Sequence, residues 1–284
     1  MREATPGYLF IAPAFLLLLL VLGYPAAASL WQSVQPAEGG PGPTLDHYAA
    51  LARSGPFWRV VGTTASFVAA SVTVHLLLGL AVALALDRPF RGRSLARVVV
   101  LLPWVVPDVV AGNVWKWVFN PLYGLLNELL LRAQLVDQPV DWLGHPALAL
   151  PSVIVANVWR GFPFVMIILL AGLQGIREEL HEAAAIDGAG PLARFRDVTL
   201  PGLRKPLVVA LALDTVWEVR RFGLVQAMTG GGPGIATEVL STQVFKQYFQ
   251  FFRFEYASAM AIAMTALLLV LSLPYVRMIV REEE

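Results

Sequence analysis

The chain has no cysteine among its 284 residues. The lack of thiols excludes disulfide frameworks, thiolate zinc sites, iron–sulfur clusters and cysteine nucleophiles. Charged residues are also scarce, since they make up 14% of the chain while hydrophobic residues make up 57%. A soluble domain carries about a quarter charged residues, because its surface faces water. The composition therefore indicates a protein whose main solvent is lipid.

An excess of one charge sign is lacking as well. The net charge is +1, from 21 basic and 20 acidic residues, so no overall field would attract nucleic acid. The four histidines are scattered and do not support a metal cluster. The GGGPG run at 230–234 lacks the Lys-Ser/Thr of a phosphate loop, and neither a serine elbow nor an HExxH motif occurs. We therefore expect no enzymatic activity, no catalytic residue, no metal and no cofactor.

Long apolar runs are what the sequence has in abundance. A membrane-crossing helix needs about 20 mostly apolar residues. The first such run could be a cleaved signal peptide, because Arg2 precedes it and the small residues PAAAS follow. We favour a membrane span, since five further spans need a starting topology. The sequence thus predicts an all-α polytopic membrane protein with six transmembrane helices, at 8–32, 60–86, 98–118, 149–175, 206–226 and 256–280.

Arginine and lysine in the loops predict the orientation of these spans, because cytoplasmic loops carry an excess of both. With a cytoplasmic N-terminus, twelve of these residues fall in inside loops and five in outside loops. Both termini are therefore predicted to be cytoplasmic. The predicted outside segments 33–57, 119–148 and 227–255 are rich in turns or aromatic residues. They could be interfacial anchors or a docking surface for an external partner, and sequence alone leaves both readings open.

The predicted inside loop 177–206, REELHEAAAIDGAGPLARFRDVTLPGLRKP, has a helical pattern of its own. Helix formers run from 177 to 186, and Gly188 then supplies a turn. Pro191 can open a second helix, which Pro201 would close. Two short helices joined by a glycine turn would make a compact projection from the membrane. By pattern alone, a docking projection and an amphipathic hairpin lying on the bilayer explain this loop equally well.

The string EAAAIDGAGPLARFRDVTLP within this loop closely resembles the EAA loop of membrane subunits of ABC importers. That motif reads E-A-A-x-x-x-G and ends in an apolar residue, leucine and proline, as Leu200 and Pro201 do here. The resemblance implies a type I ABC importer permease fold, a single permease domain over 1–284, and a coupling helix seated in a cleft of the ATP-hydrolysing subunit. The residues implied at this contact are Glu182, Ala183, Ala184, Asp187, Gly188 and Ala189.

Three further segments, at 102–127, 156–164 and 227–238, are similar to carbohydrate-uptake channel subunits, in particular the larger channel subunit of maltose and trehalose systems. The similarity implies a channel-forming subunit of an ATP-driven, binding-protein-dependent importer of a di- or oligosaccharide in a prokaryotic inner membrane. The implied partners are a second homologous permease, a dimer of cytoplasmic ATP-binding subunits, an extracytoplasmic sugar-binding protein and membrane lipid. The implied mechanism is alternating access, in which closure of the ATPase dimer pulls the loop 177–201.

Ionisable residues inside spans are costly, so they pair with one another or line a pathway. Asp214 and Glu218 lie four residues apart on one helical face, and Arg221 lies three residues beyond. An internal ion-pair network and a polar sugar cavity both explain these charges. Local similarity to the maltose channel subunit implies sugar contacts at Trp104, Asp108, Asn157, Gly161, Phe164, Asp214, Trp217, Glu218 and Arg221.

Two alternatives to a neutral sugar remain. The charges at Asp108, Asp214, Glu218 and Arg221 replace neutral polar groups of the similar channel subunit, which leaves a charged polyol such as glycerol phosphate open. A self-contained carrier driven by an ion gradient could use the three carboxylates as ion sites. That reading is disfavoured, because the spans show no obvious inverted repeat and the long inside loop would lack a purpose.

Overall fold

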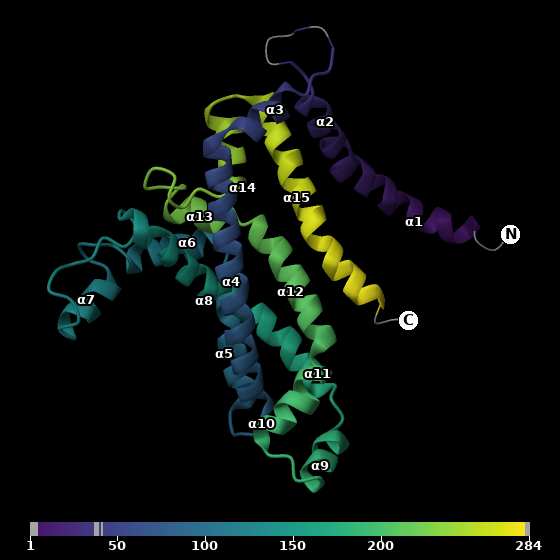
Figure 1. Cartoon of the computed structure of the whole chain (residues 1–284), viewed down its shortest axis with the longest axis vertical. Helices are drawn as coiled ribbons and strands as arrows, with labels where there is room; N and C mark the ends of the chain where they lie inside the picture. The colour runs from purple at the N-terminus through teal and green to yellow at the C-terminus, as the bar shows by residue number, and fades with distance from the viewer. Residues whose placement is uncertain (1–4, 37–39, 41, 282–284) are drawn as a thin grey trace. The chain divides into compact units, whose positions relative to one another are not determined.

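The computed structural model describes residues 5–36, 40 and 42–281, and every regular element in this part of the chain is a helix (Figure 1). The predicted all-α class is therefore confirmed. The chain divides into two compact units. One falls within residues 1–58 and 243–267, and the other within residues 59–242 and 268–284.

The first unit contains the N-terminal apolar helices, which expose their apolar side chains along Ile11–Ser33. Polar contacts join distant parts of this unit, since Ser258 Oγ lies 2.9 Å from Gln32 Oε1 and the His47 ring packs edge-on against Tyr256. Its elements are α1 (Thr5–Leu18), the π-helical turn η1 (Leu19–Gly23), α2 (Tyr24–Ser33), α3 (Asp46–Arg53) and the π-helical turn η3 (Lys246–Gln250). Three helices run from one unit into the other, namely α4 (Gly55–Asp87), α14 (Leu240–Phe245) and α15 (Phe254–Arg281).

The second unit is built around two long apolar helices, α4 and α8 (Pro146–Gln174). They approach closely at Gly79, where a Cβ would lie 2.9 Å from Val165 Cγ1. A larger residue there would push the helices apart and weaken the packing between them. The buried apolar cluster of this unit consists of Ala83, Leu86, Val165, Met166, Leu169, Leu170, Leu173, Leu203 and Ala210.

The third predicted span, 98–118, is not one straight helix. It comprises α5 (Arg93–Val105) and α6 (Asp108–Val118), which are bent by 95° relative to each other. Val106, between them, has an extended backbone with ψ 129°. A residue that precedes a proline is driven out of the helical region, and Pro107 follows here. The expectation of an uninterrupted span is therefore wrong at this proline.

The fifth predicted span, 206–226, is also interrupted. α12 (Arg204–Val219) has 16 residues and ends where Arg220 leaves helical geometry with ψ 5°. The short helix α13 (Gly223–Met228) begins after this break. Charged residues cluster near the end of α12. Their side chains contact other helices, which the side chains of a purely apolar span would not do through polar groups.

Four helices of the described residues are long and apolar enough to cross a membrane, and the bent pair α5–α6 would make a fifth. The sequence predicts six spans, so α12 is the predicted span that falls short by length. The four are Ile11–Ser33, Gly55–Asp87, Pro146–Gln174 and Phe254–Tyr275.

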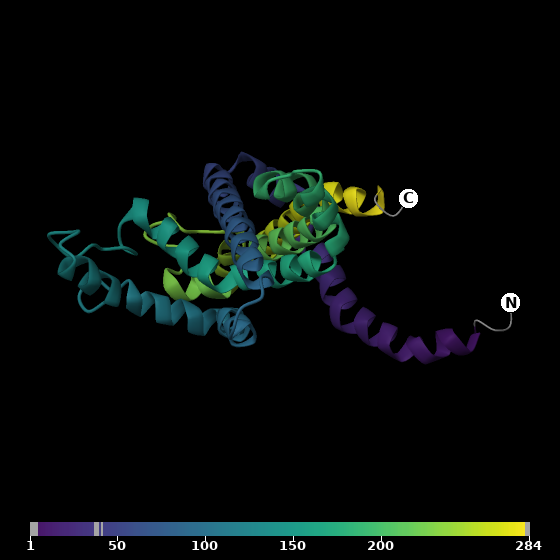
Figure 2. The ribbon, with the colours of Figure 1, turned by 90° about the horizontal axis from the view of Figure 1, so that it is seen from below.

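The predicted inside loop forms a chain of short helices at the end of the second unit where α4 and α8 end, while α7 lies to one side of that unit in both views (Figures 1 and 2). Pro201 does not close the second helix as predicted. It lies in the first turn of a new helix, where proline is tolerated, and the helical course continues through Leu203 into α12. The remaining elements are α7 (Leu125–Arg132), α9 (Glu178–Ile186), α10 (Pro191–Arg194), the π-helical turn η2 (Phe195–Thr199) and α11 (Leu200–Gly202).

Candidate functional site

The first candidate site is the hairpin of α9 and α10. Glu178 and Glu179 occupy the first turn of α9, where negative charge is favourable to the helix dipole. Gly188 follows the end of this helix with a φ of +83° that suits glycine, and the amide of Ala189 donates to the Ala184 carbonyl over 2.9 Å. The predicted glycine turn is therefore present, and it fixes the angle between the two short helices.

This hairpin presents both apolar and charged groups to its surroundings. Ile186 and Leu192 are 87% and 80% exposed, and Glu182 and Asp187 are exposed beside them. Exposed apolar side chains of this size mark surfaces that bind another molecule. The sequence analysis named the acidic residues but missed Ile186. A large apolar residue in a short helix rich in charged residues was a usable signal.

One ion pair in the loop is internal to it. Arg196 Nε and Nη2 donate to the Asp197 carboxylate over 2.7 and 3.0 Å. The hydrogen bonds from Arg196 lower the pKa of Asp197, although both side chains are largely exposed. Because Asp197 is already paired with Arg196, its charge is less open to a partner than the charges of Glu182 and Asp187.

The second candidate site is a set of charges around the C-terminal end of α12. Glu218 accepts a hydrogen bond of 2.6 Å from Asn157 Nδ2 on α8, and its other oxygen pairs with Arg221 Nη2. Asn157, Glu218 and Arg221 are at most 8% exposed. The predicted pairing of Glu218 with Arg221 is therefore confirmed.

Asp108 extends this set to α6. It lies in the first turn of that helix, where the dipole favours a carboxylate. Arg160 Nε and Arg221 Nη1 approach its Oδ1 at 2.8 and 3.1 Å. Arg160 also donates to the carbonyl of Val106, over 3.0 Å, at the break before α6. The side chains of Asp108 and Arg160 are 28% and 16% exposed, so this is the part of the set that solvent or a ligand can reach.

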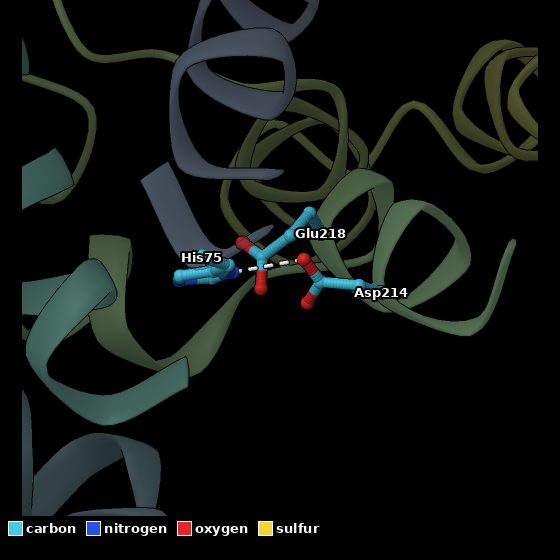
Figure 3. A group of neighbouring side chains, drawn as sticks. All are labelled: His75, Asp214 and Glu218. Carbon is cyan, nitrogen blue, oxygen red and sulfur yellow. Dashed lines mark hydrogen bonds and ion pairs between the residues drawn. The ribbon is translucent and has the colours of Figure 1, made fainter. Parts of the chain in front are cut away.

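His75 completes the set from α4 (Figure 3). Its Nδ1 lies 2.9 Å from Asp214 Oδ2 and its Nε2 lies 3.3 Å from the carbonyl oxygen of Asn157. The ring is fully buried and occupies the space where a Cβ on Gly161 would project. Sequence reasoning missed His75, although an imidazole inside an apolar span is itself a signal of a partner.

These residues form one connected set, which we call the charge network: His75, Asp108, Asn157, Arg160, Asp214, Glu218 and Arg221.

The three aromatic residues implied as sugar contacts form a separate group. The rings of Trp104 and Phe164 are stacked with centroids 5.8 Å apart, and Phe164 lies 4.4 Å from Trp217. The two tryptophans are 39% and 40% exposed. This aromatic group comes from α5, α8 and α12, and two of these helices, α8 and α12, also carry four members of the charge network. Eight of the nine implied sugar contacts thus fall into two sets, five in the charge network and three in the aromatic group, and Gly161 packs against His75 of the network.

A cation could in principle bind where His75, Asp214 and Glu218 meet, because one ligand atom of each lies within 4.8 Å of the others (Figure 3). The two Glu218 oxygens are already engaged by Asn157 and Arg221. A bound cation would have to displace these donors and lie next to a guanidinium. The donor set therefore fits an internal network better than a metal centre.

Buried charges among apolar helices, a span broken at a proline and an exposed helical hairpin together define a polytopic membrane transport subunit. The chain belongs to the family of binding-protein-dependent transport system inner membrane components, whose model matches residues 75–281. It is therefore a membrane-embedded permease subunit of an ABC importer, a transport subunit rather than an enzyme. The resemblance identified from the loop sequence is confirmed.

Individual relatives cover most of the chain. The trehalose/maltose transport system permease protein MalF of Thermococcus litoralis is 39% identical over 87% of this chain and 84% of its own length. The sulfoquinovosyl glycerol transport system permease protein SmoG of Agrobacterium fabrum is 33% identical over 95% of this chain and 89% of its own. The fold matches a chain of a bacterial ABC transporter for import of the acidic polysaccharide alginate, with a TM-score of 0.86 at 23% identity, over 99% and 96% of the two chains.

Proposed function

We propose that this chain is a channel-forming subunit of an ATP-driven importer of a neutral di- or oligosaccharide. The observation that carries the proposal is the exposed aromatic group beside the accessible Asp108–Arg160 pair. Sugars bind through one apolar ring face and a rim of hydroxyls, so a site for them needs an aromatic surface next to charged or amide groups. The trehalose/maltose relative, similar over most of both chains, supports the same substrate class.

The sugar contacts that we propose fall on both sets of residues. Trp104 and Trp217 would cover the apolar face of a sugar ring, and Asp108 would accept from its hydroxyls. The Oδ1 of Asn157 is buried and has no hydrogen-bond partner among the described residues, which leaves an acceptor to be used when the network opens. The nine proposed contacts are Trp104, Asp108, Asn157, Gly161, Phe164, Asp214, Trp217, Glu218 and Arg221.

The predicted inside loop 177–206, from here on the coupling loop, is proposed to receive force from the ATPase. Ile186 and Leu192 offer apolar contact, and Glu182 and Asp187 offer charge to a cleft in that subunit. The loop runs through α11 directly into α12, the helix that carries Trp217 and Glu218. Movement of the loop would therefore reach the proposed sugar contacts through one short connection. The proposed coupling residues are Glu182, Ala183, Ala184, Asp187, Gly188 and Ala189.

The proposed assembly contains this permease domain, residues 1–284, a second homologous permease, two cytoplasmic ATP-binding subunits and an extracytoplasmic binding protein, in a prokaryotic inner membrane. Both termini and the coupling loop would face the cytoplasm. The excess of arginine and lysine in the predicted inside loops supports this orientation.

The test is uptake into proteoliposomes that hold the whole importer, with trehalose and maltose as substrates. We expect uptake that needs both ATP and the binding protein. Trp217→Leu should raise KM about tenfold, or about 1.4 kcal/mol, because it removes the exposed stacking surface. Trp117→Leu is the matched control, since Trp117 is 71% exposed on α6 outside the aromatic group. Uptake by this chain alone, without ATP, would contradict the proposal.

A charged substrate is the second candidate, because the relative from Agrobacterium is named for sulfoquinovosyl glycerol and because two arginines meet at the partly exposed Asp108. Both arginines are paired with carboxylates here, which favours the neutral sugar. The same uptake assay decides between them when glycerol 3-phosphate and a sulfonated sugar are added as substrates. Transport of these anions in preference to trehalose would establish the second candidate.

A further inference from the structure

His75 belongs to the charge network, but it has no role in the proposed function. It is fully buried on α4, and its bonded carboxylate partner is 139 residues away on α12. Its other contact is to the backbone of α8. One ring therefore connects three helices of the second unit.

Both nitrogens of this ring face acceptors. The Asn157 carbonyl oxygen can only accept a hydrogen bond, and the Asp214 carboxylate accepts as well when it is ionised. A neutral imidazole has one N–H, so one of its nitrogens would direct a lone pair at an oxygen. The doubly protonated ring satisfies both contacts.

The charges of the network lead to the same state. It contains three carboxylates, Asp108, Asp214 and Glu218, and two guanidiniums, Arg160 and Arg221. With a neutral His75 and all three carboxylates ionised, the network would carry one uncompensated negative charge among apolar helices, which is expensive. A protonated His75 brings the sum to zero.

We infer that His75 is a positioning residue of the transport path, held as an imidazolium that neutralises the charge network and binds α12 to α4 and α8. Asp214 and Glu218 face it from α12, Arg221 follows that helix, and the Asn157 carbonyl faces it from α8. Separation of α12 from α4 breaks an ion pair, so His75 stabilises the conformation seen here. This role in transport rests on the proposed function, whereas the protonation state does not.

The first test balances charges by substitution. His75→Asn leaves the network one charge negative and Asp214→Asn leaves it one charge positive, so each should reduce sugar uptake about tenfold or more at an equal membrane level of protein. The double variant restores neutrality with two amides that can bond each other. Although Asp214 is also a proposed sugar contact, the double variant should take up sugar at least about threefold faster than either single variant. Losses that simply add in the double variant would overturn the inference.

A pH profile separates the charge from mere packing. Uptake by the native importer should fall on the alkaline side, because loss of the His75 proton leaves the network negative and removes one donor. The double variant has no such proton and should lack this alkaline limb. His145→Asn is the matched control: it removes an exposed imidazole, and asparagine can keep the N-cap that His145 gives to α8. It should retain the native profile, and an alkaline limb retained in the double variant would contradict the inference.

The second test reads the protonation state directly and needs no transport. The assembled importer is labelled with ¹⁵N-histidine in a chain that keeps His75 and replaces its other three histidines, with the histidines of the partner subunits unlabelled. At neutral pH both ring nitrogens should give protonated signals. A signal from one bare nitrogen would overturn the inference. A response of these signals to added Zn²⁺ or to a chelator would also overturn it, in favour of a metal site.

The uptake assay and the nitrogen signals test the proposed function and the inference independently. If no sugar is taken up, the proposed function fails and the nitrogen signals still decide the state of His75. If the signals show a neutral ring while trehalose is transported, the inference fails and the proposed function stands.

Discussion

Gly161 leaves the space in the interior that the ring of His75 occupies. A Cβ at this position would overlap the imidazole of His75, so the absence of a side chain on α8 is what lets the ring reach the Asn157 carbonyl. Interiors are close-packed, and an added methyl group there has no room to relax. The glycine that sequence similarity implied as a sugar contact thus has a packing role in this conformation.

We predict that Gly161→Ala destabilises the protein by about 1–3 kcal/mol, because the methyl group displaces His75 from both of its partners. The measurement is the thermal unfolding midpoint of the purified protein in detergent. Gly62→Ala on α4 is the control, since a Cβ there meets nothing within 4 Å, and it should leave the midpoint unchanged or slightly raised. Equal midpoints for both variants would show that the ring has room to move.

Residue-level prediction from the sequence succeeded where contacts are local. Glu218 lies near the end of α12 and Arg221 lies two residues beyond that end, so their separation of three residues alone predicts the pair. His75 could not be found in this way, because no periodicity links it to a carboxylate 139 residues later. The scattered histidines gave no sign of a cluster, since the cluster exists only after the helices pack.

At the scale of elements, the breaks in α5–α6 and at the end of α12 have different causes. The first break follows a local rule, since Pro107 excludes Val106 from helical geometry. The second break follows the charged end of α12. There, side chains form ion pairs with other parts of the fold, and the backbone leaves helical geometry. Hydropathy averages over such positions and predicted two continuous spans.

The hairpin of the coupling loop was predicted more closely, because its helix formers and glycine turn are local signals. Gly188→Pro should uncouple the importer. Proline cannot adopt the φ of +83°, and it removes the amide that bonds the Ala185 carbonyl. We expect sugar-stimulated ATP hydrolysis to fall at least about tenfold while the chain still inserts in the membrane.

The measurement compares ATP hydrolysis with and without sugar-loaded binding protein in proteoliposomes. Gly190→Ala is the control, since its φ of −69° is open to any residue and its Cβ would meet nothing within 4 Å. Native stimulation in the Gly188 variant would refute the proposal that this turn transmits force.

At the scale of the whole molecule, the class and the family could be predicted from the sequence. The composition indicates a lipid environment, and the short loop motif indicates the family and its ATPase partner. The exact number of spans was not, since length and apolarity alone admit four or five among the described residues. The lack of cysteine provides a direct means to test the orientation, because any introduced thiol is the only one in the chain.

We predict that Leu122→Cys is labelled by an impermeant maleimide from outside intact cells, whereas Ile186→Cys is labelled only in inverted vesicles. Both positions are highly exposed in this chain, at 89% and 87%, so each thiol is open to the reagent on its own side when the chain is produced without the ATPase. The extent of labelling is read from a mass shift of the purified chain. Labelling of both cysteines from the same side would reverse or break the proposed topology.

The direct run of the loop into α12 makes that helix a rigid rod pivoted at the end that meets the loop. From Arg204 to Glu218 the rod is about 21 Å long at about 1.5 Å per residue. A tilt of about 10° at the pivot would displace Glu218 by about 4 Å, farther than its 2.6 Å bond to Asn157 can stretch. Even a small tilt of α12 would therefore have to break the contact of Glu218 with Asn157. This contact sets an energy threshold that small thermal movements of the helix do not cross.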